Sequence, residues 1–306
     1  MSTQSLPHIL TLVAPADRGL TDADLAAAAE ALNAAGAEAI GAPRWLCEGV
    51  AADLPFDGLE HSAAHAAVDA TDALVRLDRA AQPAGGRRKR MLIADMDSTM
   101  IEIETLDTIA LLLGFGEKVA EITRRSMNGE IGFEESLVER VALLEGHPAD
   151  ETLAQVMQRV TYTEGGETLV RTMAANGARC LLVSGGFTFT TDVVHRRLGF
   201  HAHKANRLEI VDGRFTGCVV GPIVGRATKL ETLKALAHEL RAGLDAALAV
   251  GDGANDLDML TAAGLGVGFR AKPIVREQAP HRIDHTDLAT LLYYQGYRYE
   301  EFVAGS

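Results

Sequence analysis

The sequence predicts an α/β protein built on a Rossmann-like parallel sheet. Four short apolar runs, MLIAD, RCLLVSGG, AALAVGDG and LGVGF, each have the length and composition of a buried strand. Amphipathic segments with a helical period separate them, and this alternation is typical of parallel strands joined by crossover helices. With 306 residues and 47% hydrophobic content, the chain has room for about two domains and a sizeable core.

Residues 1–82 are expected to form a small N-terminal α+β domain. An extended apolar run, HILTLVA, precedes the Ala-rich helical segment LTDADLAAAAEALNAAG, and a second extended stretch lies near Glu38 to Trp45. Thr21 is placed to cap the helix and Gly36 to end it. This order of elements resembles part of the amino-acid-binding ACT fold, and the resemblance implies a regulatory role.

Residues 83–90 are expected to be a linker between this domain and the rest of the chain. Proline and glycine mark the change in composition, and they are followed by the charge run Arg87, Arg88, Lys89 and Arg90. Runs of like charge are usually solvated surface. We therefore expect these four side chains to face water.

The remaining residues, 91–105 and 161–306, are expected to form the core of the protein. Between its first two strands, residues 106–160 are helical throughout, which predicts an inserted helical cap over the sheet. A further segment, NRLEIVDGRFTGCVVG, is typical of a hairpin that turns at Asp212 and Gly213.

Charge and cysteine content exclude several classes of function. The 42 acidic and 29 basic residues give a formal charge of −13, which argues against wrapping of nucleic acid. The three cysteines suggest neither a disulfide framework nor a zinc site, and this favours a reducing, cytoplasmic compartment. The longest apolar stretches, such as IALLLGF, are far shorter than a membrane span, so we expect no membrane partner.

Polar residues follow three of the predicted strands. Asp95 and Asp97 end the first, Ser184 and Gly185 end the second, and the third runs into GDGAND, which holds Asp252, Asn255 and Asp256. Ligands bind at the carboxyl ends of strands in open α/β sheets, and free amides at a helix start attract anions. Lys229, near the start of the helical segment KLETLKALAHEL, lies between the second and third motifs.

The order of these motifs resembles the haloacid dehalogenase superfamily of phosphotransferases and, within it, the phosphoserine phosphatases. The resemblance covers about residues 89–292 and includes DMDSTMIEIETLD, LLVSGGF, Lys229, VGDGANDLDML and a matching cap stretch, ITRRSMNGEIGFEESLVERVALLEG. It implies hydrolysis of L-phosphoserine to L-serine and phosphate, the last step of serine biosynthesis, through an aspartyl-phosphate.

The resemblance also implies a role for each residue. Asp95 would be the nucleophile and Asp97 the general acid and then the general base. Mg²⁺ would be held by Asp95, Asp252 and the backbone carbonyl of Asp97. Phosphoryl oxygens would be bound by Ser184, Gly185 and Lys229, with Asn255 and Asp256 orienting substrate or nearby ligands.

Substrate choice is expected to come from the cap. Glu104 matches the position that binds the ammonium group of the substrate, and Arg140 the position that binds its carboxylate. Met127 and Phe133 would add apolar cover when the cap closes. We expect a small-molecule substrate. Whether the protein forms a homodimer is left undecided by the sequence.

Two alternatives stay open beside this hypothesis. One is a phosphatase or phosphotransferase for another small phosphoester, such as phosphohomoserine or phosphothreonine. The other is a non-catalytic amino-acid sensor, which the complete set of motif residues disfavours. Surface or structural roles are expected for a group of histidines without partners at a recognisable metal-ligand spacing, namely His61, His65, His195, His201 and His203.

Overall fold

The structure is a computed structural model that describes residues 6–127 and 130–304. Its strands are β1 His8–Val13, β2 Ala39–Ile40, β3 Arg44–Cys47, β4 Ala51–Asp57, β5 Asp78–Pro83, β6 Met91–Ala94, β7 Arg179–Phe187, β8 Ala202–Val211, β9 Arg214–Val220, β10 Ala247–Gly251, β11 Leu265–Phe269 and β12 His281–Ile283. Its α-helices are α1 Asp22–Ala34, α2 His61–Asp69, α3 Thr105–Leu112, α4 Gly116–Met127, α5 Phe133–Ala142, α6 Asp150–Met157, α7 Gly166–Ala175, α8 Thr188–Leu198, α9 Arg226–Glu239, α10 Leu257–Ala262, α11 Pro273–Gln278 and α12 Thr290–Tyr294.

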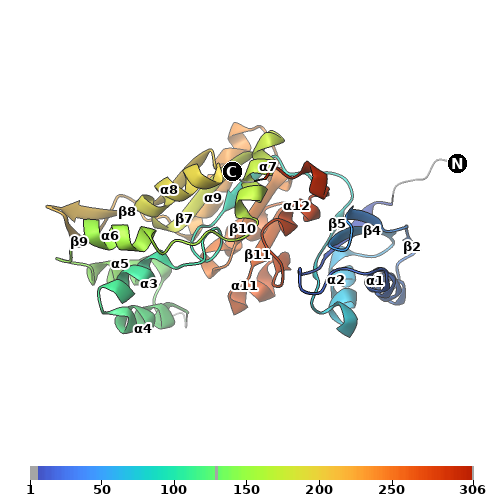
Figure 1. The fold of residues 1–306 in the computed structure, drawn as a ribbon, viewed down its shortest axis with the longest axis horizontal. Helices are drawn as coiled ribbons and strands as arrows, with labels where there is room; N and C mark the ends of the chain where they lie inside the picture. The colour runs from blue at the N-terminus through green and yellow to red at the C-terminus, as the bar shows by residue number, and fades with distance from the viewer. Residues whose placement is uncertain (1–5, 128–129, 305–306) are drawn as a thin grey trace.

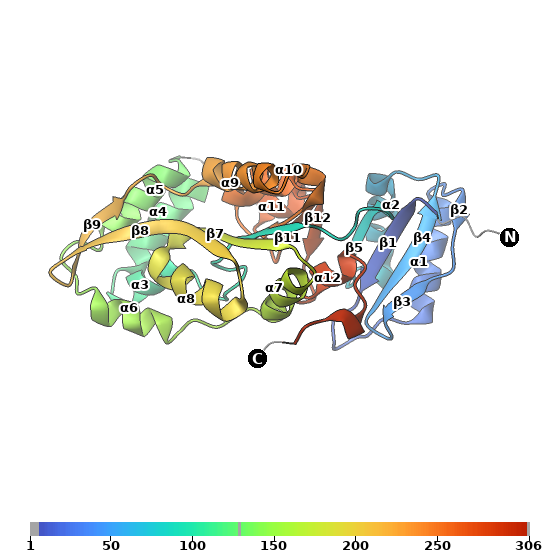
Figure 2. The ribbon, with the colours of Figure 1, turned by 90° about the horizontal axis from the view of Figure 1, so that it is seen from above.

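One sheet runs through the molecule in the order β2-β4-β1-β5-β12-β11-β10-β6-β7-β8-β9, with β3 paired to β4 (Figures 1 and 2). The four strands expected from the sequence are β6, β7, β10 and β11, and they pair in parallel. The predicted α/β fold with a parallel core is therefore confirmed. The parallel part of the sheet also includes β12 and the first half of β8, which the sequence patterns did not predict.

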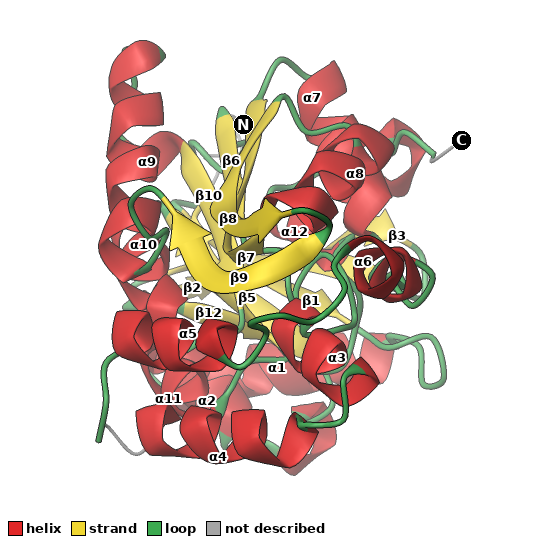
Figure 3. Ribbon diagram, turned by 90° about the vertical axis from the view of Figure 1, so that its left-hand side faces the viewer, coloured by secondary structure: helices red, strands yellow, loops and turns green. Residues whose placement is uncertain are grey.

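Helices cover both faces of the parallel sheet (Figure 3). Met91 and Ile93 pack with residues of α9, α10 and α11 in one apolar cluster. Leu92 and Ala94 point the other way and pack with α7, α8 and α12. This alternation along β6 explains why an uninterrupted apolar run is needed there, since a strand buried on both faces has no polar side.

None of the described helices is both long enough and apolar enough to cross a membrane.

The region expected to be a helical cap contains α3 to α6 and no strand among its described residues. The predicted hairpin is also confirmed: β8 and β9 pair in antiparallel, and Asp212 and Gly213 at the turn have φ of 50° and 72°. Leu208 and Phe215 of the hairpin share an apolar cluster with Leu137 and Val141 of α5. The hairpin therefore packs with the inserted helices, away from the sheet centre (Figure 2).

The N-terminal residues form an antiparallel patch of five strands, β1 to β5, covered by α1 and α2. Thr21 caps α1 as expected, in a capping box with Asp24, and Gly36 follows the helix end with φ of 102°. Sequence patterns did not indicate β4, α2 or β5, whose polar or Ala-rich stretches lack a clear period. The limits of this domain stay a prediction.

The N-terminal patch joins the core through a buried ion pair. Arg87 Nη1 lies 2.6 Å from Asp53 Oδ2, Arg87 Nη2 lies 2.9 Å from Asp53 Oδ1, and the guanidinium also donates to the carbonyl oxygens of Tyr293 and Tyr294. Only 10% of the Arg87 side chain and 6% of the Asp53 side chain are exposed. The expectation that the whole charge run faces water is therefore wrong at Arg87, because a carboxylate 34 residues earlier pairs with it.

We expect Asp53→Ala to lower the free energy of unfolding by about 3 kcal/mol, because it leaves a guanidinium buried without its carboxylate partner. Urea unfolding would measure the change. The matched control is Asp17→Ala, which removes an exposed partner of Arg76 and should cost less than about 1 kcal/mol. Equal losses in the two variants would show that the Arg87 pair does not hold the units together.

Candidate active site

The site lies at the carboxyl ends of three neighbouring strands. Asp95 follows β6, Ser184 lies near the carboxyl end of β7, and Asp252 follows β10. Because β6 pairs with both β7 and β10, the three loops meet at one edge of the sheet. The structure thus brings together the motifs that the sequence placed far apart along the chain.

Lys229 is the buried cation of this site. Its side chain has no exposed surface, and its Nζ lies 2.8 Å from Asp95 Oδ1 and 2.5 Å from Asp256 Oδ1. The other oxygen of Asp256 accepts a 3.0 Å hydrogen bond from the amide of Gly253. Asp256 therefore fixes the position of the ammonium group, and the two carboxylates raise the pKa of Lys229 against the effect of burial.

Burial raises the pKa of several carboxyl groups here. It raises the pKa of Asp95 to about 7, helped by the nearby Asp256 and opposed by Lys229. It also raises the pKa of Asp252 to about 6, with Asp95 adding to the shift and Lys272 opposing it. Three buried carboxylates in one place repel one another, so the site needs more positive charge than Lys229 and Lys272 supply.

The residues present fit a divalent cation. Asp95, Asp252 and Asp256 each offer a carboxylate oxygen, and these oxygens lie within 4.8 Å of one another. Mg²⁺ prefers carboxylate and water oxygens, so the donor set suits it. The side chain of Asp97 is not in this group, and the contribution of its backbone carbonyl stays a prediction.

Asp97 has a different environment from Asp95. Its carboxylate accepts hydrogen bonds from the hydroxyl and the amide of Thr105, at 2.7 and 3.2 Å. Burial, together with the charge of Glu104, raises its pKa well above the ordinary value. A Cβ added at Gly186 would lie 2.9 Å from Asp97 Oδ2 and 3.1 Å from Ser184 Oγ, so a residue without a side chain is needed between the two loops.

Ser184 and Gly185 lie against this carboxyl group and the cap. The hydroxyl of Ser184 is fully buried and accepts a 2.9 Å hydrogen bond from the amide of Gly186. A Cβ at Gly185 would come within 2.8 Å of the ring of Phe133 and within 3.6 Å of Asn255 Nδ2. Phe133, the first residue of α5, therefore places the cap directly against Gly185.

Glu104 and Arg140 lie at the rim of the site. Glu104 accepts a 3.0 Å hydrogen bond from Ser98 and lies 3.2 Å from Lys272 Nζ. Arg140 donates through Nε to the carbonyl oxygen of Ser136. Burial lowers the pKa of Arg140, and the carboxylates that oppose this shift are Asp107, Glu104 and Asp97. The positive charge of the guanidinium is therefore close enough to these three carboxylates to interact with them.

Met127, predicted as apolar cover, is the last residue of α4, and its side chain lies outside the described residues.

Two polar contacts at the site were not found from the sequence. Thr105, the first residue of α3, holds Asp97 as described above. Lys272 lies 3.2 Å from Asp252 Oδ2 as well as from Glu104. Lys272 follows β11, so the rule that placed the other loops at the carboxyl ends of parallel strands could have found it.

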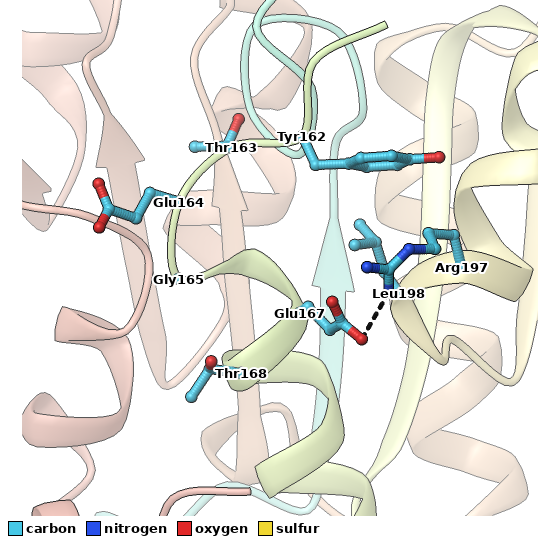
Figure 4. A pocket seen from close by; sticks show the side chains of 8 residues that line it. All are labelled: Tyr162, Thr163, Glu164, Gly165, Glu167, Thr168, Arg197 and Leu198. Atoms are coloured by element: carbon cyan, nitrogen blue, oxygen red, sulfur yellow. Dashed lines mark ion pairs between the residues drawn. The ribbon is translucent and has the colours of Figure 1, made fainter. Parts of the chain in front are cut away.

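A separate pocket of about 250 Å³ lies where α7 begins and α8 ends (Figure 4). Glu167 and Arg197 face each other across it at 2.6 Å, and the ring of Tyr162 lies above the guanidinium. None of the predicted site residues lines this pocket. It is therefore distinct from the carboxylate site, which lies at the opposite end of α8.

The family model for haloacid dehalogenase-like hydrolases matches residues 92–261. A curated phosphoserine phosphatase from Streptomyces coelicolor is 43% identical over 256 residues, which cover 83% of this chain and 62% of that protein. The one from Streptococcus thermophilus is 44% identical over 200 residues, covering 65% of this chain and 93% of that protein. The crystal structure of a probable phosphoserine phosphatase from Vibrio cholerae has a TM-score of 0.76 and 32% identity, and the match covers 98% of this chain and 91% of that one.

We expect Mg²⁺ to stabilise the protein more at about pH 8 than at about pH 5. The folded-state pKa values of Asp95 and Asp252 lie above the ordinary value of 3.8, so the metal-free fold loses stability as the pH rises through about 6 to 7. A bound cation offsets that loss, whereas at low pH protons occupy the same oxygens. Thermal unfolding with and without Mg²⁺ across this range measures the effect.

Asp252→Asn serves as the control in the same titration, since it removes one of the two titrating carboxyls. A Mg²⁺ effect that is independent of pH in the unmodified protein would contradict the assignment of the cation to these carboxylates.

Proposed function

Because the chain belongs to the haloacid dehalogenase-like hydrolases, and among them to the phosphoserine phosphatases, we propose that it hydrolyses L-phosphoserine to L-serine and phosphate. One observation carries the proposal: Asp95 and the fully buried Lys229 are paired at the carboxyl end of β6, beneath a cap that reaches the same loops. A nucleophile and a fixed cation side by side suit the attack of a carboxylate on a phosphoryl group.

Asp95 is the nucleophile in this proposal. Attack on phosphorus needs the ionised carboxylate, and the charge of Lys229 lowers a pKa that burial raises. Mg²⁺, held by Asp95, Asp252 and the carbonyl of Asp97, would neutralise charge between the carboxylate and the phosphoryl oxygens. Asp256 acts through Lys229 and is a positioning residue.

Asp97 is the general acid and then the general base. A group that begins the reaction protonated needs a raised pKa, and burial with the nearby Glu104 supplies it. Thr105 holds the carboxyl group in place at both oxygens. From there Asp97 donates a proton to the leaving serine oxygen and later takes one from the water that releases phosphate.

The remaining phosphoryl oxygens face donors from β7 and α9. The Ser184 oxygen accepts the Gly186 amide, which leaves its own hydrogen free to be donated to the substrate. The Gly185 amide and the ammonium group of Lys229 complete the set, and Asn255 lies beside Gly185. These groups are held before substrate arrives, which is the condition for stabilising charge that develops in the transition state.

The cap selects the amino acid part of the substrate. Glu104 pairs with its ammonium group and Arg140 with its carboxylate, at the rim where both side chains lie. Phe133 excludes water above Gly185, and Met127 is proposed to add to this cover.

Asp95→Asn is expected to fold normally and to lose turnover by several orders of magnitude, because an amide cannot attack phosphorus. Phosphate release from L-phosphoserine and circular dichroism measure the two properties. Asp258→Asn is the control, since this acid in the first turn of α10 lies outside the proposed site and pairs with Arg226. Substantial activity in folded Asp95→Asn would remove the nucleophile assignment.

Asp97→Asn is expected to spare formation of the phosphoenzyme from p-nitrophenyl phosphate more than from L-phosphoserine. Only the poor leaving group, the serine oxygen, needs a proton from Asp97. Rapid-quench measurement of the first turnover compares the two substrates. Equal losses on both would mean that Asp97 is not the acid.

Arg140→Ala is expected to reduce kcat/KM for L-phosphoserine by about 10-fold to 150-fold, the effect of losing a charged hydrogen bond of about 1.5–3 kcal/mol. Phosphoethanolamine lacks the carboxylate, so its low rate should change little. Arg124→Ala is the control, because this exposed arginine of the cap pairs only with Glu121 among the contacts described. A common loss on both substrates would mean that Arg140 supports the cap itself.

A further inference from the structure

A second group of metal-ligating side chains lies on α8 and the start of β8. Asp192 and His195 are three residues apart on one face of α8, and His203 is the second residue of β8. His203 Nε2 lies 3.0 Å from Asp192 Oδ1, and the rings of His195 and His203 stack with their centroids 4.3 Å apart. No recognisable spacing in the sequence links these residues, and surface or structural roles were expected for the two histidines; they become neighbours because β8 brings His203 beside α8.

Thr191 orients both imidazole rings. Its carbonyl oxygen lies 3.0 Å from His195 Nδ1, and its hydroxyl lies 2.8 Å from His203 Nδ1. A carbonyl oxygen can only accept, so Nδ1 of His195 carries the proton. In the neutral ring this leaves the lone pair on Nε2, the atom available for a metal ion.

His203 can present its Nε2 in the same way. As a neutral ring without metal, Nε2 donates to Asp192 and Nδ1 accepts from the Thr191 hydroxyl. That hydroxyl can turn to the carbonyl oxygen of Thr188, 3.4 Å away, and accept from Nδ1 instead. The proton then moves to Nδ1, which frees Nε2 for a metal with no change in the charge of the ring.

We propose that Asp192, His195 and His203 bind one divalent transition-metal ion of the class that imidazole prefers, such as Zn²⁺ or Co²⁺. Each side chain offers one ligand atom, and these atoms lie within 4.8 Å of one another. Ligands of a tetrahedral zinc ion, at about 2.0–2.1 Å from the metal, are about 3.4 Å apart, so small side-chain rotations complete the site. Water takes the fourth position.

The ligand atoms of this site give it a different metal preference from that of the carboxylate site. Two nitrogen ligands and one oxygen favour Zn²⁺, Co²⁺ or Ni²⁺ over Mg²⁺, which prefers oxygen alone. Burial and the neighbouring His195 lower the pKa of His203, so the ring is neutral and able to bind a metal near neutral pH. Hydrogen bonds from the second ring nitrogen to a carbonyl or hydroxyl are what metal-bound histidines usually make.

A metal bound here would tie α8 to β8. The first turn of α8 follows the loop of Ser184 and Gly185, and Asn206 of β8 donates a 2.8 Å hydrogen bond to the carbonyl oxygen of Gly185. Holding these two elements together restrains the phosphate-facing loop from its outer side. Zn²⁺ should therefore raise the unfolding temperature.

The test is a Co²⁺ titration of the full chain in excess Mg²⁺, followed by visible absorption, with Zn²⁺ as the competitor. The unmodified protein should bind one Co²⁺ with the absorption of a nitrogen-ligated site, and Zn²⁺ should displace it. His203→Ala and the more conservative Asp192→Asn should each weaken binding by at least about tenfold.

Two controls keep the result specific. His201→Ala removes a histidine of the same segment that lies outside the group, and it should bind Co²⁺ like the unmodified protein. Asp252→Asn impairs the carboxylate site and should also keep the Co²⁺ signal. Unchanged affinity in His203→Ala and Asp192→Asn, or loss of the signal in Asp252→Asn, would overturn the proposal.

Discussion

The buried ammonium group of Lys229 is the constraint on which the rest of the site depends. An unpaired ion in the protein interior costs several kcal/mol, so a lysine without exposed surface needs carboxylates at contact distance. Asp95 and Asp256 supply them from the loops after β6 and β10. Gly251 must lack a side chain, because a Cβ there would collide with the Asp256 carboxyl group. The loops of β6 and β10 and the start of α9 are thus held at one point by charge pairing.

The same burial raises the pKa of two neighbouring carboxyl groups whose surroundings otherwise differ. Asp95 lies beside Lys229, and its pKa is raised to about 7, within reach of ionisation once a further cation is present. Asp97 has Thr105 and Glu104 beside it in place of a cation, and its pKa is raised well above the ordinary value. A carboxyl group paired with a cation is suited to act as nucleophile, and one whose pKa is raised with no cation in contact is suited to act as acid in the same reaction. The environment of each carboxyl group, more than its position in the sequence, decides its proposed role.

Much of the fold could be predicted from local patterns. Apolar runs located β6, β7, β10 and β11, the Asp212-Gly213 turn located the hairpin, and the strand-end rule brought Asp95, Ser184 and Asp252 together. Short or polar elements such as β12 and β5 have no local signal, because pairing with distant strands forms them. The same reason hides the pairs of Arg87 with Asp53 and of His203 with Asp192: each joins residues from different elements, and no fixed spacing links them. Local sequence patterns therefore could not predict which charged side chains pair with each other in the folded protein.

The most direct test of this account is the mass of the enzyme trapped during turnover. Protein mixed with L-phosphoserine and Mg²⁺, then quenched in acid within the first turnovers, should carry one phosphoryl group, and peptide mapping should place it on Asp95. The nucleophile must bear the phosphoryl group between the two steps, because the carboxylate oxygen replaces the serine oxygen on phosphorus before water arrives. Active protein that gives no such adduct under any quench time, or an adduct on a residue other than Asp95, would contradict the account.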